Sequence, residues 1–105
     1  MPLVNLATRM ASAYLRDDRV AVGRLLPEAE GHFEEAGMGA GMIAMFHFYL
    51  GEPDTGFEWL ERAYARREDS LMAITYDQDF DGVRSDPRYL DLVKRLGLGH
   101  VKYQQ

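Results

Sequence analysis

The stretch GEPDTGFEWLERAYARRED, residues 51–69, indicates the fold class of this chain. Pro53 suits the first turn of a helix, because the backbone donor that proline lacks would have no partner there. The apolar side chains that follow recur at helical spacing, with two more beside them: Phe57, Leu60 and Tyr64, then Trp59 and Ala63. This spacing places them on one side of a helix. The stretch therefore predicts an amphipathic helix over residues 53–67.

The same spacing extends along nearly the whole chain and predicts further helices over residues 3–16, 19–36, 42–50, 71–76 and 87–96. Pro27 interrupts the second of these, so we expect a kink or short break at Leu26, with Val20 on the apolar side. Asp86 is expected to cap the last helix and Gly97 to end it. No segment alternates apolar and polar residues with a period of two. The predicted class is all-α.

Composition narrows the possible functions. A chain of 105 residues with 47% hydrophobic residues predicts one globular domain. The formal net charge of −5 argues against a nucleic-acid partner and against an anionic membrane surface. The chain has no cysteine, which excludes disulfides, a thiolate nucleophile and a cysteine-ligated zinc. No signal peptide or membrane span is evident, so we expect a cytoplasmic protein.

A period of 34 residues relates the two halves of the helical region, since Asp17 and Gly51 occupy corresponding turns 34 residues apart. The second half has small residues at four spaced positions and a large apolar residue at a fifth: Ala44, Gly51, Gly56 and Ala63, with Leu60. This pattern resembles the tetratricopeptide (TPR) repeat, although Glu68 stands where that motif has a proline. The first half matches less well, because Met10 and Val22 replace small residues. Small residues at such a crossing let two helices approach closely.

The segment DQDFDGVRSDPRYLDLVKRLGL, residues 77–98, resembles the end of many bacterial TPR-containing regulators. The resemblance implies a TPR-like solenoid of two helix pairs with a C-terminal capping helix, forming a single domain over residues 1–105. Its parts are a degenerate repeat (1–36), a clearer repeat (37–70), a capping segment (71–98) and a tail (99–105). It also leaves open that the chain is a fragment of a longer solenoid or regulator.

The aspartates of DQDFDGVRSDPR, residues 77–88, raise the alternative of a calcium loop. A calcium loop of the EF-hand type needs a bidentate glutamate at its twelfth position, where this chain has Arg88. We therefore interpret the stretch as structural: Asp79 and Asp81 favour turns, Arg84 pairs with a nearby carboxylate, and Asp86 caps a helix. We expect no metal site.

No residue pattern indicates catalysis. The three histidines lie on separate elements without metal-ligand spacing, and no serine lies in a nucleophile motif. We interpret His47 as a packed or groove residue. We therefore expect no enzyme activity and no cofactor.

The TPR resemblance implies a concave groove, to which it assigns mostly apolar residues: Tyr14, Met38, Met45, Phe48 and Tyr49. We add His47 to this set as a polar group that can contact a ligand. Because a large exposed apolar patch marks an interface, we predict a protein–protein interaction or scaffold module. It would bind an apolar peptide segment or self-associate into a homo-oligomer through the groove. The alternatives are that these residues belong to the core, or that the groove holds a small molecule in a non-catalytic sensor.

Overall fold

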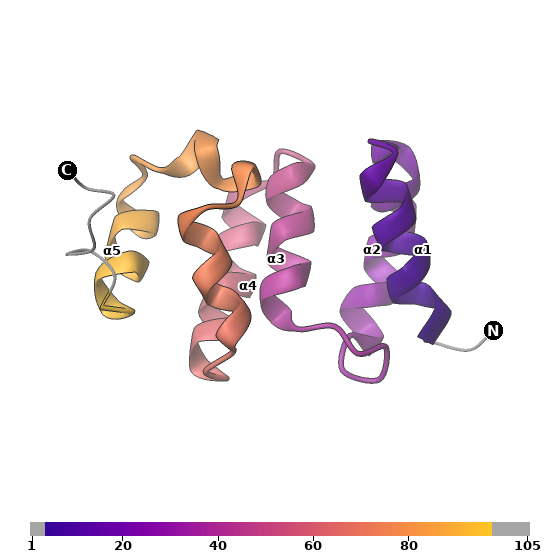
Figure 1. Ribbon diagram of the computed structural model, residues 1–105, viewed down its shortest axis with the longest axis horizontal. Coiled ribbons are helices and arrows are strands. Elements are labelled where there is room, and N and C mark those ends of the chain that lie inside the picture. Colours follow the sequence, from indigo (N-terminus) through magenta and orange to yellow (C-terminus); the bar gives the residue numbers. More distant parts are fainter. Residues whose placement is uncertain (1–3, 98–105) are drawn as a thin grey trace. The chain divides into compact units, whose positions relative to one another are not determined.

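The computed structural model describes residues 4–97, which divide into a hairpin unit up to Leu71 and a closing unit from Met72 onward. The division lies next to position 71, where the sequence predicts the capping segment to begin. Figure 1 shows that the regular structure is helical, and no strand occurs within residues 4–97. The all-α prediction is confirmed.

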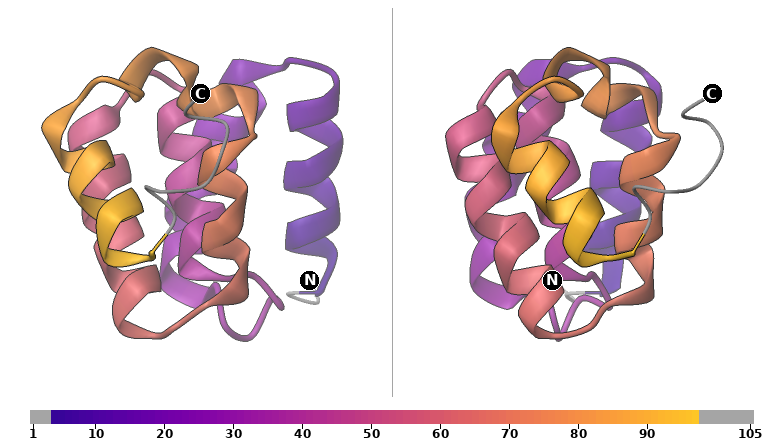
Figure 2. Two further views of the ribbon diagram at one scale, coloured as in Figure 1. Left: turned by 60° about the vertical axis from the view of Figure 1, so that its left-hand side comes forward. Right: turned by 90° about the vertical axis from the view of Figure 1, so that its left-hand side faces the viewer.

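The first hairpin pairs α1 (Val4–Leu15) with α2 (Arg19–His32) in antiparallel fashion, as Figure 2 shows. Its core residues lie at steps of three and four on both helices: Leu6, Met10 and Ala13 on α1, and Val22, Leu26 and Ala29 on α2. This spacing gives each helix one apolar side that the other helix can cover.

The predicted break at Leu26 is wrong, since α2 runs without interruption through Pro27. Pro27 has no amide hydrogen to donate to the Gly23 carbonyl, its partner in a regular helix. Both residues are exposed, so water can bond to that carbonyl instead. The prediction that Val20 lies on the apolar side is also wrong, because Val20 is 69% exposed and Val22 is buried instead.

The second hairpin pairs α3 (Ala40–Tyr49) with α4 (Pro53–Ala65). Gly56 permits their close approach, because a Cβ there would lie 2.7 Å from Cε2 of Phe48. The Phe48 ring also meets Phe57 edge to face, with centroids 5.0 Å apart. Most of α3 is buried, as an apolar helix that must be covered on several sides requires.

The two hairpins turn in the same way. A residue with positive φ follows each of their four helices: Asp17 at 55°, Gly37 at 78°, Gly51 at 80° and Arg67 at 56°. After α1, α3 and α4 the next residue's amide donates back to the helix, at 2.9 Å for Asp18 to Ala13 and 2.8 Å for Glu52 to His47, and after Gly37 the Met38 amide donates to Phe33, directly after α2. These are Schellman caps, in which a left-handed residue lets the chain satisfy the last carbonyls. The caps at Asp17 and Gly51 are 34 residues apart, as are the starts of α2 and α4.

Glu68, after α4, caps the start of α3. Its two carboxylate oxygens accept from the backbone amides of Ala40 and Gly41, each at 2.9 Å. The contact depends on Gly39, because a Cβ at that position would lie 2.8 Å from Oε1 of Glu68. This cap explains why α3 begins at Ala40 and not at the predicted Met42, since the amides of its first turn now have partners.

Aromatic and guanidinium groups link the end of α2 to α4. Phe33 meets Trp59 edge to face at 5.3 Å, and Arg62 lies 4.0 Å from the centroid of Trp59. Arg66 lies 5.3 Å from the Phe33 ring and pairs with Glu34 at 2.6 Å. These contacts place flat cations against ring faces, a stabilising arrangement.

The closing unit is built from the end of η1 (Asp69–Thr75), η2 (Gln78–Val83) and α5 (Pro87–Arg95). Both η segments are 3₁₀ helices, so the short helix predicted from Leu71 has the tighter form. Asp86 caps α5 as predicted, by accepting from the Arg88 amide at 2.8 Å. The Arg88 side chain and this amide lower the pKa of Asp86. Gly97 follows α5 with φ of 75°, as expected for the end of the helix.

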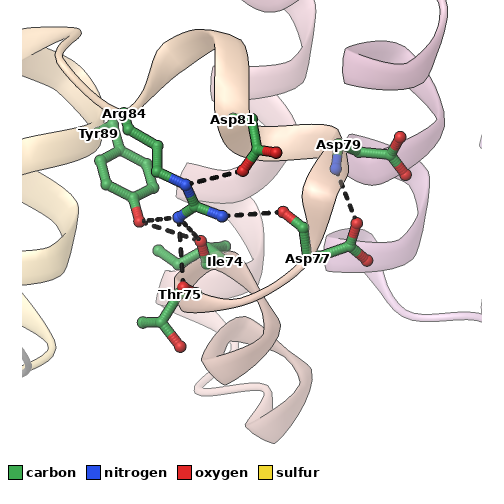
Figure 3. Close-up of polar contacts among 7 residues, drawn as sticks. All are labelled: Ile74, Thr75, Asp77, Asp79, Asp81, Arg84 and Tyr89. Atoms are coloured by element: carbon green, nitrogen blue, oxygen red, sulfur yellow. Dashed lines mark hydrogen bonds and ion pairs between the residues drawn. The ribbon is translucent and has the colours of Figure 1, made fainter. Parts of the chain in front are cut away.

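Arg84 organises this unit, as Figure 3 shows. Its Nη1 donates to the Ile74 carbonyl at 2.9 Å and to the Tyr89 hydroxyl at 2.6 Å, and Nη2 donates to the Asp77 carbonyl at 3.0 Å. Its Nε pairs with Asp81 at 3.0 Å, which confirms the predicted carboxylate partner. One planar guanidinium thus joins η1, η2 and α5 by several donors in a fixed fork geometry that lysine lacks.

Replacing Arg67 by glycine should stabilise the fold. A left-handed conformation costs an L-residue roughly 1–2 kcal/mol, and glycine removes this cost. Glycine also has more freedom in the unfolded chain, which offsets about 0.4–1 kcal/mol of that stabilisation. We expect a net gain of about 0.5–1 kcal/mol in the free energy of unfolding, measured by urea denaturation. The matched control is Gly51→Ala, which should shift stability in the opposite direction; a gain there would refute the account.

Stability should fall in acid through Glu68. Burial acts to raise the pKa of this carboxyl, but the amides of Gly41 and Ala40 and the Arg66 guanidinium outweigh it, so the pKa is lowered. A lowered folded-state pKa gives stability that is present above the ordinary glutamate value, about 4.3, and is lost as pH falls through the folded-state pKa. Urea melts between neutral pH and acid should show a steeper loss for the native chain than for Glu68→Gln. Parallel curves would contradict the assignment.

Candidate functional site

A cleft opens on the first hairpin, between α1 and α2. Its volume is about 290 Å³, and we call it the arginine cleft after its lining: Arg9, Ser12, Ala13, Arg16, Ala21, Arg24 and Leu25. Its α1 residues are three or four apart, and so are those of α2, so each helix contributes one face. Three guanidinium groups thus lie along one small depression with an apolar floor.

Two of these guanidinium groups are unpaired. Within residues 4–97, Arg9 and Arg24 make no ion pair or hydrogen bond through their side chains. Arg16 is engaged, because it donates to the Ser12 hydroxyl at 2.5 Å and lies 3.7 Å from the Asp18 carboxylate. Unpaired guanidinium groups beside apolar surface can bind carboxylate or phosphate oxygens.

The cleft can bind but is poorly equipped for proton transfer. Arginine stays protonated in proteins and cannot act as a general base. Ser12 is the other polar group in the lining, and its hydroxyl contacts Arg16, which offers no base. This chemistry suits recognition of an anionic group.

The predicted groove residues lie mostly inside the hairpin unit. Met38, His47, Phe48 and Tyr49 are no more than 9% exposed, while Tyr14 and Met45 are half-buried. Their contacts are internal: Tyr14 meets Tyr49 edge to face at 4.9 Å, and the Tyr49 hydroxyl donates to Asp17 at 2.6 Å. Arg19 lies over the Tyr49 ring at 4.4 Å and donates to the Tyr49 carbonyl. The packed alternative thus accounts for the contacts of most of this set.

His47 ties the two hairpins together. Its Nδ1 lies 2.7 Å from Oε1 of Glu52, and its Nε2 contacts Oε2 of Glu30 on α2. Each carboxylate oxygen is an acceptor, so both contacts are hydrogen bonds only when both ring nitrogens carry protons. The sequence places His47 among apolar residues and gives no sign of these two partners.

The aspartates of residues 77–81 make internal contacts. Asp77 caps η2 by accepting from the Asp79 amide at 2.9 Å, and Asp81 pairs with Arg84. The sequence predicts turn-forming bonds for Asp79 and Asp81, whereas the bond seen here is made by Asp77. Across residues 4–97, no group of three or more His, Cys, Asp or Glu residues is placed to hold a metal ion.

Sequence reasoning missed the arginine cleft. The available signal was the spacing of Arg9, Ser12 and Arg16 on one helix, repeated by Ala21 and Arg24 on the next. The net charge of −5 concealed it, because a sum over the chain says nothing of how charges are distributed.

Comparisons with known proteins give no family: no family model, curated protein or solved structure matches this chain. Among the helices of residues 4–97, none is long and apolar enough to cross a membrane.

Replacing Phe48 by glutamate should unfold the hairpin unit. The ring is 8% exposed and fills the space over Gly56, so a charge there would be buried without a partner. We expect loss of the cooperative unfolding transition in circular dichroism. The control is Leu15→Glu, at a side chain that is 81% exposed, which should leave the transition unchanged. A folded Phe48→Glu chain with altered assembly would instead support the open groove.

Proposed function

We propose that this chain is a TPR-like, non-catalytic interaction module that binds a segment of a partner protein in the arginine cleft. The observation that carries the proposal is the pair of unpaired guanidinium groups, Arg9 and Arg24, beside an apolar floor. Cations left without partners next to apolar surface are typical of a recognition site, because they can gain both charge pairing and buried area on binding.

The repeat geometry supports the TPR-like part of the proposal. The ends of α1 and α3, at Leu15 and Tyr49, are 34 residues apart, as are the starts of α2 and α4. Both hairpins turn through a left-handed residue at the same position of this period, Asp17 in one and Gly51 in the other. A fixed period with a repeated turn is what a helical-hairpin solenoid requires.

The cleft favours a protein segment over a small molecule. At about 290 Å³ it lies at the lower limit of pockets that enclose drug-sized ligands, which run from roughly 300 to 1,000 Å³. It also lies open between two helices, so a ligand keeps much of its surface in water. A peptide that lays one or two side chains into the cleft fits these dimensions.

Selection of peptides from a random displayed library tests this function. Binders should be recovered with the native chain and retained by Thr8→Trp, at an exposed α1 position outside the cleft. The variant Ser12→Trp, which fills the cleft, should weaken their binding about tenfold or more, measured by fluorescence anisotropy. Circular dichroism confirms that both variants fold. Equal binding by Ser12→Trp would place the site elsewhere, and recovery of no peptide would overturn the function.

A further inference from the structure

The position of each arginine follows from the hairpin geometry. Because α1 and α2 run antiparallel from the turn at Asp17, residues at equal distances from the turn lie at the same level. Ala13 and Ala21 are each four residues from Asp17, while Arg9 and Arg24 are eight and seven residues away (17 − 9 = 8; 24 − 17 = 7). The two unpaired guanidinium groups thus belong to one end of the cleft, and Arg16 belongs to the turn end.

The floor between these ends is apolar, formed by Ala13, Ala21 and Leu25. Along α1, Arg9 and Arg16 are seven residues apart, which corresponds to a rise of about 10.5 Å. A peptide in the polyproline II conformation has three residues per turn and rises about 3.1 Å per residue, so residues three apart lie on the same side and span about 9.3 Å. The lengths match.

We infer that the arginine cleft binds an acidic–apolar–acidic protein segment, with two carboxylates three residues apart in a chain of polyproline II conformation. One carboxylate lies between Arg9 and Arg24, where both guanidinium groups can donate to it. The other lies near Arg16 and Ser12, and the apolar residues between them cover the floor. This inference rests on the proposed function and names the chemical class of the partner.

Charge elsewhere on the chain limits the partner to a short acidic motif. Asp17 and Asp18 lie in the turn that follows α1, so a polyanion that extends past the turn end of the cleft meets like charge there. Asp18 already lies beside Arg16 at the turn end. A short segment with two carboxylates among apolar residues can pair with the arginines without reaching the acidic residues outside the cleft. A nucleic acid would extend past the cleft and is therefore disfavoured.

The test uses the full chain and a fluorescein-labelled peptide with the core Glu-Leu-Leu-Glu in a Gly/Ser frame. Arg9→Gln and Arg24→Gln should each weaken its binding about tenfold, as expected for loss of one charge-assisted contact. Lys94→Gln, at an exposed α5 position, should leave the affinity unchanged. The peptides Gln-Leu-Leu-Gln and Glu-Glu-Leu-Leu should bind at least about tenfold more weakly than the first. Affinity should fall as salt is raised.

Several results would overturn the inference. If the Gln-Leu-Leu-Gln peptide binds as tightly as the Glu-Leu-Leu-Glu peptide, the carboxylates are not what the cleft recognises. Equal competition by inorganic phosphate would indicate a simple oxyanion site, and tighter binding of a single-stranded DNA oligonucleotide would indicate a nucleic-acid surface. Salt-sensitive self-association abolished by Arg9→Gln would make a second copy the occupant. If displayed peptides bind in the cleft but carry no acidic pair, the inference fails while the proposed function stands.

Discussion

The carboxylate of Glu68 is the contact on which the arrangement of the second hairpin depends. It lies after α4 in the chain but occupies the start of α3, where it accepts from two backbone amides. Arg66 holds the same carboxylate at 2.8 Å and also reaches Glu34 beyond α2. One charged group therefore fixes where α3 begins and how the end of α4 meets it. The amides of a helix N-terminus favour an anion in this position, because their dipoles point toward it.

Close approach of backbone and side chain makes this arrangement possible. Gly39 leaves room for the Glu68 carboxylate, and Gly56 leaves room for the Phe48 ring. A methyl group at either position would lie within 3 Å of its neighbour, so the Glu68 carboxylate or the Phe48 ring would have to shift. The core thus uses its largest aromatic groups in internal contacts, and this is why residues expected in an open groove are buried.

The first hairpin is different, because its small residues lie at the surface cleft. Ala13 and Ala21 leave a depression where α1 and α2 meet, and long arginine side chains stand around it. Ala13 belongs both to the buried contact between the helices and to the lining of this depression. Val22 and Leu26 are buried in the hairpin, whereas Arg9 and Arg24 are exposed and lie outside its core.

The sequence alone determined the helical class, several of the helix ends and the period, because these follow from local chemistry. Apolar spacing, Pro53 and Pro87 at helix starts, and Gly51 and Gly97 at helix ends each act within a turn or two of chain. Only the tertiary structure decided that α2 runs through Pro27, that Glu68 caps a helix some 28 residues before it, and that His47 meets two carboxylates. It also decided which arginines share a cleft. These features depend on groups distant in sequence, and helical periodicity says which side chains share a face but not what that face meets.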